Sequence, residues 1–383
     1  MPTESQREVR FKQLDGLRGL AALAVFFFHA IMMLPPNSPA LAVLTKPFLR
    51  PFWDGPSAVM LFFVLSGYVL TLPYTDPKPR RIDAIPFIIR RITRLYPAYW
   101  VVLSIALALK SFVFSPQGLQ GLSEWVNSHW QLEITWSSLI KHFTMISPYL
   151  NSYEIDPVIW SLIIEMKVSL IFPAILLLVQ RTRRVRHALL ALGLTIVLSA
   201  LIHGPLDKGS QWLHVVTMLP VFCLGSYLAK YRDALLHFLR KSALIRAALG
   251  SVGLILYGSA WFLPFLNRGV SRLGTAIGSS IIVMLFLASI SLEKLGTSRP
   301  VVFLGNISYS FYLIHLPILL TLTSVLYPLT GSVLLSTVVS LACSLPAAWA
   351  VFVTVEIRGQ NWGKGIARSF DRRLSASAVR SAS

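Results

Sequence analysis

DGLRGLAALAVFFFHA, residues 15–30, opens an apolar segment that continues to Leu34. A helix crosses the ~30 Å hydrocarbon core of a membrane with about 20 apolar residues, so this segment predicts a transmembrane helix. It nevertheless contains Arg18 and His29, which are 11 positions apart. An ideal helix places such a pair within about 20° of the same face and roughly 16 Å apart along its axis. One helix face therefore presents a cation near the membrane surface and an imidazole well inside the membrane.

Ionisable groups are costly inside a membrane, so both residues are candidates for a functional site. A long anionic substrate could be held at Arg18 and present its reactive end at His29. Imidazole accepts a hydroxyl proton near neutral pH, as a general base does. The alternative is that His29 is a packed core histidine and that Arg18 only marks the cytoplasmic end of the helix.

The rest of the chain is similarly apolar. Of its 383 residues, 55% are hydrophobic and 13% are charged, and the mean hydropathy is +0.64. Soluble domains carry about 25% charged residues. The composition therefore predicts an all-α integral membrane protein with about ten transmembrane helices. The predicted spans are Leu17–Leu34, Pro56–Leu72, Leu95–Phe114, Val158–Val179, Ala188–Ile202, Trp212–Ala229, Leu244–Leu266, Leu273–Ser291, Ile307–Leu326 and Ser332–Val355.

The charge distribution predicts the orientation. The chain has 35 Lys and Arg against 16 Asp and Glu, a formal charge of +19. The basic residues cluster on one predicted side of the membrane, so the excess indicates topology with cytoplasmic termini rather than nucleic-acid binding. We expect a plasma-membrane protein with three parts: a cytoplasmic N-terminal segment (residues 1–12), a membrane domain (residues 13–357) and a basic, disordered cytoplasmic tail (residues 358–383). The basic clusters are Lys78–Arg94, Arg181–Arg186, Lys230–Lys241 and Arg358–Arg380.

The longest predicted outer segment, Ser115–Pro157, is rich in Trp and has Lys141 as its one basic residue. It could form an interfacial lid or an acceptor-binding surface. The alternative is that its Trp and Tyr side chains anchor the protein at the headgroup level.

A second candidate site is a run of arginines, Arg90, Arg91 and Arg94, at the start of the third predicted span. Residues three and four apart share one side of a helix, so these guanidinium groups can converge. The planar guanidinium fork matches pairs of phosphate oxygens. The run could therefore bind a phosphate, although basic residues are expected at a cytoplasmic helix end in any case.

A carboxylate, Glu165, lies inside the fourth predicted span, after Trp160 and Ser161. A buried carboxylate needs a partner, and His29 or an arginine is the natural candidate. Such a carboxylate can orient a catalytic histidine. It could equally form an ion pair that only locks two helices together.

A polar stripe follows one face of the ninth predicted span, where Tyr309, Tyr312 and His315 recur at every third position. The stripe suits a water-accessible cavity or a substrate contact. Interhelical hydrogen bonds are the alternative. The histidines of the chain have no metal-ligand spacing, so we predict no metal site.

In order and spacing, these segments resemble the acyltransferase family 3 membrane proteins over roughly residues 10–357. The resemblance implies an acyl-CoA donor bound from the cytoplasmic side, with Arg18, Arg91 and Arg94 near its phosphates, and His29 as the catalytic histidine. The segments that carry it are LDGLRGLAA (14–22), FFVLSGY (62–68), RITRLYP (91–97), WSLIIE (160–165), FCLG (222–225) and ISYSFYLIHLP (307–317).

The sequence thus predicts a membrane O-acyltransferase that moves an acyl group, with acetyl expected, from acyl-CoA to a hydroxyl group. The acceptor could be a glycan, a lipid-linked sugar or a small molecule, and membrane lipid and a second copy of the chain are further expected partners. A proton-coupled transporter or flippase of a glycan or lipid precursor is the alternative. We assign catalysis to His29, Glu165 and His315, donor binding to Arg18, Arg90, Arg91 and Arg94, and substrate contacts to Trp160, Ser161, Tyr309 and Tyr312.

Overall fold

The computed structural model describes residues 11–75, 82–113, 119–128, 133–145, 154–182, 184–202, 211–266 and 268–380. Within these ranges all regular secondary structure is helical, which confirms the all-α prediction. Three predicted features lie wholly or partly outside the described residues: the N-terminal segment, the start of the Lys78–Arg94 cluster and much of the Ser115–Pro157 segment.

Eight helical segments are long and apolar enough to cross a membrane, so the chain is a multi-pass membrane protein. Two further predicted spans correspond to α8 (Val185–Ile202) and α11 (Ala243–Tyr257), whose apolar parts are shorter. The count of about ten spans and the cytoplasmic termini remain predictions. The eight segments contain α1 (Lys12–Met32), α3 (Gly55–Thr71), α4 (Ala84–Val113), α7 (Ile159–Arg181), α9 (Gln211–Lys230), α13 (Arg268–Ala288), α15 (Arg299–Thr330) and α16 (Val333–Val351).

Shorter helices connect the long ones. A π-helical stretch, Phe352–Glu356, joins α16 to α17. Inserted π-helical turns are rare and occur frequently at functional sites. The connecting helices include α2 (Pro39–Leu44), α5 (Glu124–Asn127), α6 (Trp136–Thr144), α10 (Arg232–Arg240), α12 (Ser259–Phe262) and α14 (Ile290–Gly296).

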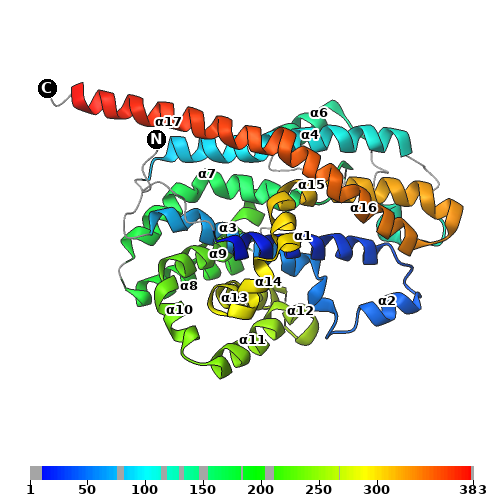
Figure 1. Cartoon of the computed structure of the whole chain (residues 1–383), viewed down its shortest axis with the longest axis horizontal. Coiled ribbons are helices and arrows are strands. Elements are labelled where there is room, and N and C mark those ends of the chain that lie inside the picture. The colour runs from blue at the N-terminus through cyan, green and yellow to red at the C-terminus, as the bar shows by residue number, and fades with distance from the viewer. Residues whose placement is uncertain are drawn as a thin grey trace.

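The basic C-terminal segment differs from our expectation, because we predicted disorder and the structure has a helix, α17 (Ile357–Arg380). Figure 1 shows α17 (red) alongside α4 (cyan), and the two helices pack on one another. The packing is close because Gly359 and Gly363 meet Thr93 of α4. A Cβ atom on Gly359 would lie 2.4 Å from the Thr93 carbonyl oxygen. Burial against α4 gives this part of the polar sequence a reason to be helical.

Helices α1 and α15 form the scaffold of the candidate site. They run parallel and in register, because Gly19 packs against Gly305 and His29 against His315, both 286 positions apart. A Cβ atom on Gly19 would lie 2.5 Å from the Gly305 nitrogen, so only glycine permits this backbone approach. The register brings His315, the last residue of the polar stripe of α15, against His29 of α1.

Candidate active site

Two histidines form a hydrogen-bonded pair at the centre of the site. His29 Nδ1 of α1 lies 3.1 Å from His315 Nε2 of α15. His315 is fully buried, and its Nδ1 lies 3.1 Å from the carbonyl oxygen of Phe311. A carbonyl oxygen can only accept, so His315 Nδ1 carries the proton, and Nε2 of the neutral ring is an acceptor. His29 Nδ1 therefore donates to it, which leaves the lone pair of His29 on Nε2.

This tautomer suits a general base. The nitrogen that takes a proton must carry a lone pair, and the second nitrogen must be held by a hydrogen bond that fixes the ring. His315 provides that bond to His29. An aromatic ring also packs on His29. Trp125 of α5 stacks on its imidazole, with the ring centroids 5.6 Å apart and an interplanar angle of 21°.

Glu165 does not orient His29, contrary to our sequence-based mechanism. Its Oε1 accepts hydrogen bonds from Arg91 Nη2 at 2.5 Å and from Ser66 Oγ at 3.3 Å. Arg91 Nε also donates to Ser169 Oγ at 3.1 Å. The sequence analysis named either His29 or an arginine as the partner of Glu165. Among the described residues, the partner is an arginine, Arg91. Glu165 thus joins α7 to α4 and α3.

The arginines separate into three kinds. Arg91 is buried and engaged with Glu165. Arg18 and Arg94 are partly exposed and interact electrostatically with one another and with Arg91 and Glu165, yet neither has a hydrogen-bond acceptor within the described part of the chain. Their N–H groups are therefore suited to an anionic ligand. Arg90 also lies on α4, and its side chain has no hydrogen bond or ion pair to a described residue.

A second buried carboxylate adjoins these arginines. Glu356 ends the π-helical stretch and is 3% exposed. It accepts hydrogen bonds from Ser310 Oγ at 2.8 Å and Gln360 Nε2 at 3.1 Å, and interacts electrostatically with Arg18 and Arg94. It thereby connects the arginines to α15.

The predicted substrate-contact residues have varied surroundings. Tyr312 Oη lies 2.7 Å from Ser161 Oγ and donates to the Val158 carbonyl oxygen at 3.1 Å, so α15 is joined to the start of α7. Tyr309 Oη donates to the Leu95 carbonyl oxygen of α4 at 2.6 Å. Both hydroxyl groups thus make the interhelical hydrogen bonds that we named as the alternative.

Trp160 packs edge-on against Phe63, with ring centroids 6.4 Å apart, and remains partly exposed. Among the described contacts it lies against α3 and not against either histidine.

Polar groups connect the arginines to the histidine pair. Ser161 and Glu165 share one side of α7, one helical turn apart. Tyr312 contacts Ser161, and its ring lies 5.9 Å from the ring of His315. The arginine end and the imidazole end of the site are therefore linked across three helices.

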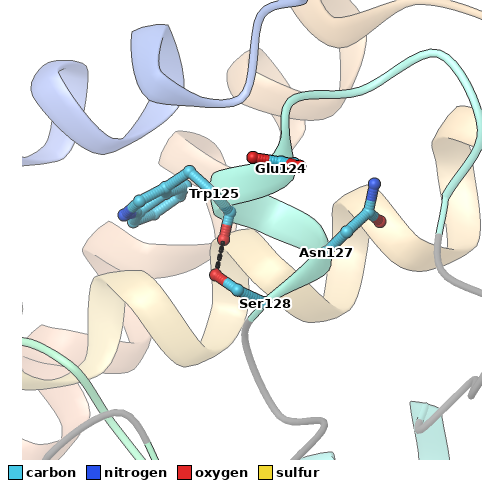
Figure 2. A pocket seen from close by; sticks show the side chains of 4 residues that line it. All are labelled: Glu124, Trp125, Asn127 and Ser128. Atoms are coloured by element: carbon cyan, nitrogen blue, oxygen red, sulfur yellow. Dashed lines mark hydrogen bonds between the residues drawn. The ribbon is translucent and has the colours of Figure 1, made fainter.

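A pocket of about 530 Å³ opens at α5. Its lining residues are Glu124, Trp125, Asn127 and Ser128. Figure 2 shows the Trp125 side chain on the opposite side of the helix from Asn127, and Ser128 Oγ donates to the Trp125 carbonyl oxygen at 2.9 Å. Trp125 is thus shared by the pocket, which it lines, and by His29, on which it stacks.

Sequence reasoning did not single out Trp125 or Ser169. The spacing of Ser161, Glu165 and Ser169 at every fourth position could have indicated the second one. Trp125 is one of 10 tryptophans and has no local signal that sets it apart.

Comparison with known proteins identifies the family. The family model described as "Acyltransferase domain" matches residues 11–353. Peptidoglycan O-acetyltransferase OatA of Listeria monocytogenes serovar 1/2a is 28% identical over 338 residues, which are 82% of this chain and 50% of that protein. O-acetyltransferase OatA of Staphylococcus aureus strain NCTC 8325 is 25% identical over 332 residues, which are 81% of this chain and 51% of that protein.

A shorter relative is the ORF330 protein of Acidianus two-tailed virus, 26% identical over 79% of this chain and 82% of that protein. The chain spans about half the length of the two OatA relatives. No solved structure is a significant match.

The matched range includes both histidines, Glu165 and all four candidate arginines. It favours acyl transfer over the transporter that the sequence alone left open. The family model covers most of the length of this chain, so the chain belongs to the acyltransferase 3 family.

Proposed function

We propose that this chain is an O-acyltransferase of the plasma membrane that moves an acyl group, with acetyl expected, from acyl-CoA to a hydroxyl group of a glycan. The observation that carries the proposal is the hydrogen-bonded pair of His29 and His315, in which Phe311 fixes the tautomer. Family membership supports the reaction class. The names of the OatA relatives support a glycan acceptor, because one is a peptidoglycan O-acetyltransferase.

The chemical step follows from the tautomer. His29 Nε2 takes the proton of the acceptor hydroxyl as its oxygen attacks the thioester carbonyl carbon. The new C–O bond forms, the C–S bond breaks, and the thiolate of CoA leaves. The imidazolium of His29 then returns its proton to the thiolate, so the base is regenerated. Such general-base assistance contributes about 10²–10⁴ in rate.

The donor occupies the other end of the site in this proposal. Arg18 and Arg94 bind the phosphates of acyl-CoA, since their N–H groups have no acceptor among the described residues. Arg91 and Glu165 position these arginines rather than bind the donor themselves. The pantetheine arm then spans the helical rise of roughly 16 Å from Arg18 to His29, so a long donor reaches both groups.

A donor-consumption assay tests the proposal. The purified chain in lipid nanodiscs is incubated with radiolabelled acetyl-CoA and an N-acetylglucosamine tetrasaccharide. We expect release of free CoA and transfer of label to the sugar. A transporter would release no CoA in this assay, and that result would overturn the proposal.

A substitution of His315 tests the tautomer argument. We expect His315→Leu to lower kcat by about 10–100-fold, because removing one partner of a buried hydrogen bond costs about 1–3 kcal/mol. The KM for acetyl-CoA should stay unchanged, since the donor phosphates lie at the other end of the site. Steady-state kinetics of acetyl transfer separate the two parameters.

His315→Gln serves as the matched variant for this test. Its side-chain oxygen can accept the hydrogen bond from His29 Nδ1, so we expect a kcat well above that of His315→Leu. Equal losses in both variants would show that His315 contributes packing and not the tautomer.

A further inference from the structure

The short helix α5 is fixed to the end of α1 that carries His29. Ser123, just before α5, donates through its N–H to the Met33 carbonyl oxygen at 3.2 Å and through Oγ to the Met32 carbonyl oxygen at 2.5 Å. Asn127 accepts from the Leu119 N–H at 2.7 Å and donates to its carbonyl oxygen at 3.2 Å. The two hydrogen bonds of Ser123 hold the start of α5 against the end of α1, and the two of Asn127 tie α5 to the segment that precedes it.

The chemistry of the pocket suits an uncharged, hydroxyl-rich ligand. Trp125 provides an apolar indole edge, against which the C–H groups of a sugar ring can pack while one face of the indole stacks on His29. The exposed Glu124 carboxylate is an acceptor for hydroxyl donors, and Ser128 Oγ keeps acceptor capacity after donating to Trp125. Among the described residues that line the pocket there is an acid and no base, which disfavours the phosphates of an acyl donor. A volume of about 530 Å³ is within the range of small-molecule sites.

We infer that the α5 pocket is the subsite for the acceptor sugar, with Trp125 as the platform that presents a sugar hydroxyl to His29. The inference rests on the proposed function and adds the place and the recognition of the acceptor. Trp125 connects the pocket to the candidate catalytic histidine, because it lines the pocket and stacks on His29. A sugar packed at the edge of its indole would therefore be held beside the catalytic imidazole.

The test measures acceptor kinetics with the full chain in nanodiscs, radiolabelled acetyl-CoA and the N-acetylglucosamine tetrasaccharide. We expect Trp125→Ala to raise the acceptor KM by about 10-fold or more, as loss of a central aromatic contact does, while the KM for acetyl-CoA stays the same. Trp125→Phe should retain part of the affinity. Ser128→Phe, at an exposed position, should fill the pocket and raise the acceptor KM without disturbing the helix packing.

Trp136→Ala is the matched control, because Trp136 is 83% exposed on the neighbouring helix α6 and lines no part of the pocket. Unchanged acceptor KM in Trp125→Ala and Ser128→Phe, with active wild-type protein, would overturn the subsite and leave the proposed function standing. Acetyl-CoA consumption without transfer to the sugar would likewise overturn a carbohydrate acceptor. A wild-type protein that consumes no acetyl-CoA would overturn the proposed function itself.

Discussion

Replacing His29 with asparagine is expected to lower the rate of acetyl transfer by about 10²–10⁴-fold, the usual contribution of a general base. Asparagine can still donate to His315 Nε2 through its amide, so the helix pair is kept. Its side chain cannot take a proton from the acceptor, because an amide is not basic near neutral pH. Initial rates of label transfer from acetyl-CoA measure the effect.

The control for this variant is His237→Asn, at an exposed position of α10 outside the site. It should transfer acetyl at the wild-type rate. A folded His29→Asn protein with normal transfer would contradict the general-base role. Thermal unfolding of both variants in the same detergent establishes that folding is comparable.

Hydropathy was sufficient to predict where the long helices lie, because a membrane imposes a minimum apolar length on each span. It also predicted spans at α8 and α11, whose apolar parts are shorter than that length, so these two spans stay predictions. It also missed the helix in the C-terminal segment. The close contacts of Gly359 and Gly363 with Thr93 of α4 stabilise that helix and join residues far apart in the sequence.

The sequence predicted residues of the candidate site, but not which of them contact one another. Helical periodicity correctly puts Arg18 and His29 on one face of α1, since that geometry is local. It does not say which side chain of another helix meets them. Glu165 could have met His29 or an arginine, and the packing of α4 against α7 selects Arg91. Trp125 meets His29 through a tertiary contact, in which Ser123 ties α5 to the end of α1.

The second large expected effect is the loss of stability when the buried ion pair between Arg91 and Glu165 is broken. We expect Arg91→Gln to destabilise the protein by about 3–5 kcal/mol, because it leaves the carboxylate of Glu165 without its charged partner in a site removed from water. Arg90→Gln is the matched control, as Arg90 is the preceding residue of α4 and has no ion pair with a described residue. Its effect should stay within about 0.5 kcal/mol. Equilibrium unfolding of the three proteins in one detergent measures both values.

The double variant Arg91→Gln/Glu165→Gln separates the ion pair from other causes of instability. Two amides can hydrogen-bond with one another, so the double variant should be more stable than Arg91→Gln alone, and the double-mutant cycle should give a coupling energy of about 0.5–3 kcal/mol. Additive effects would mean that Arg91 is held by Ser169 or by packing and not by the carboxylate.

The same variants also test donor binding, because Arg18 and Arg94 interact electrostatically with the pair of Arg91 and Glu165. If Glu165 and Arg91 position the two partly exposed arginines, the double variant should regain stability yet keep a raised KM for acetyl-CoA, since restored packing does not restore the placement of the phosphate-binding groups.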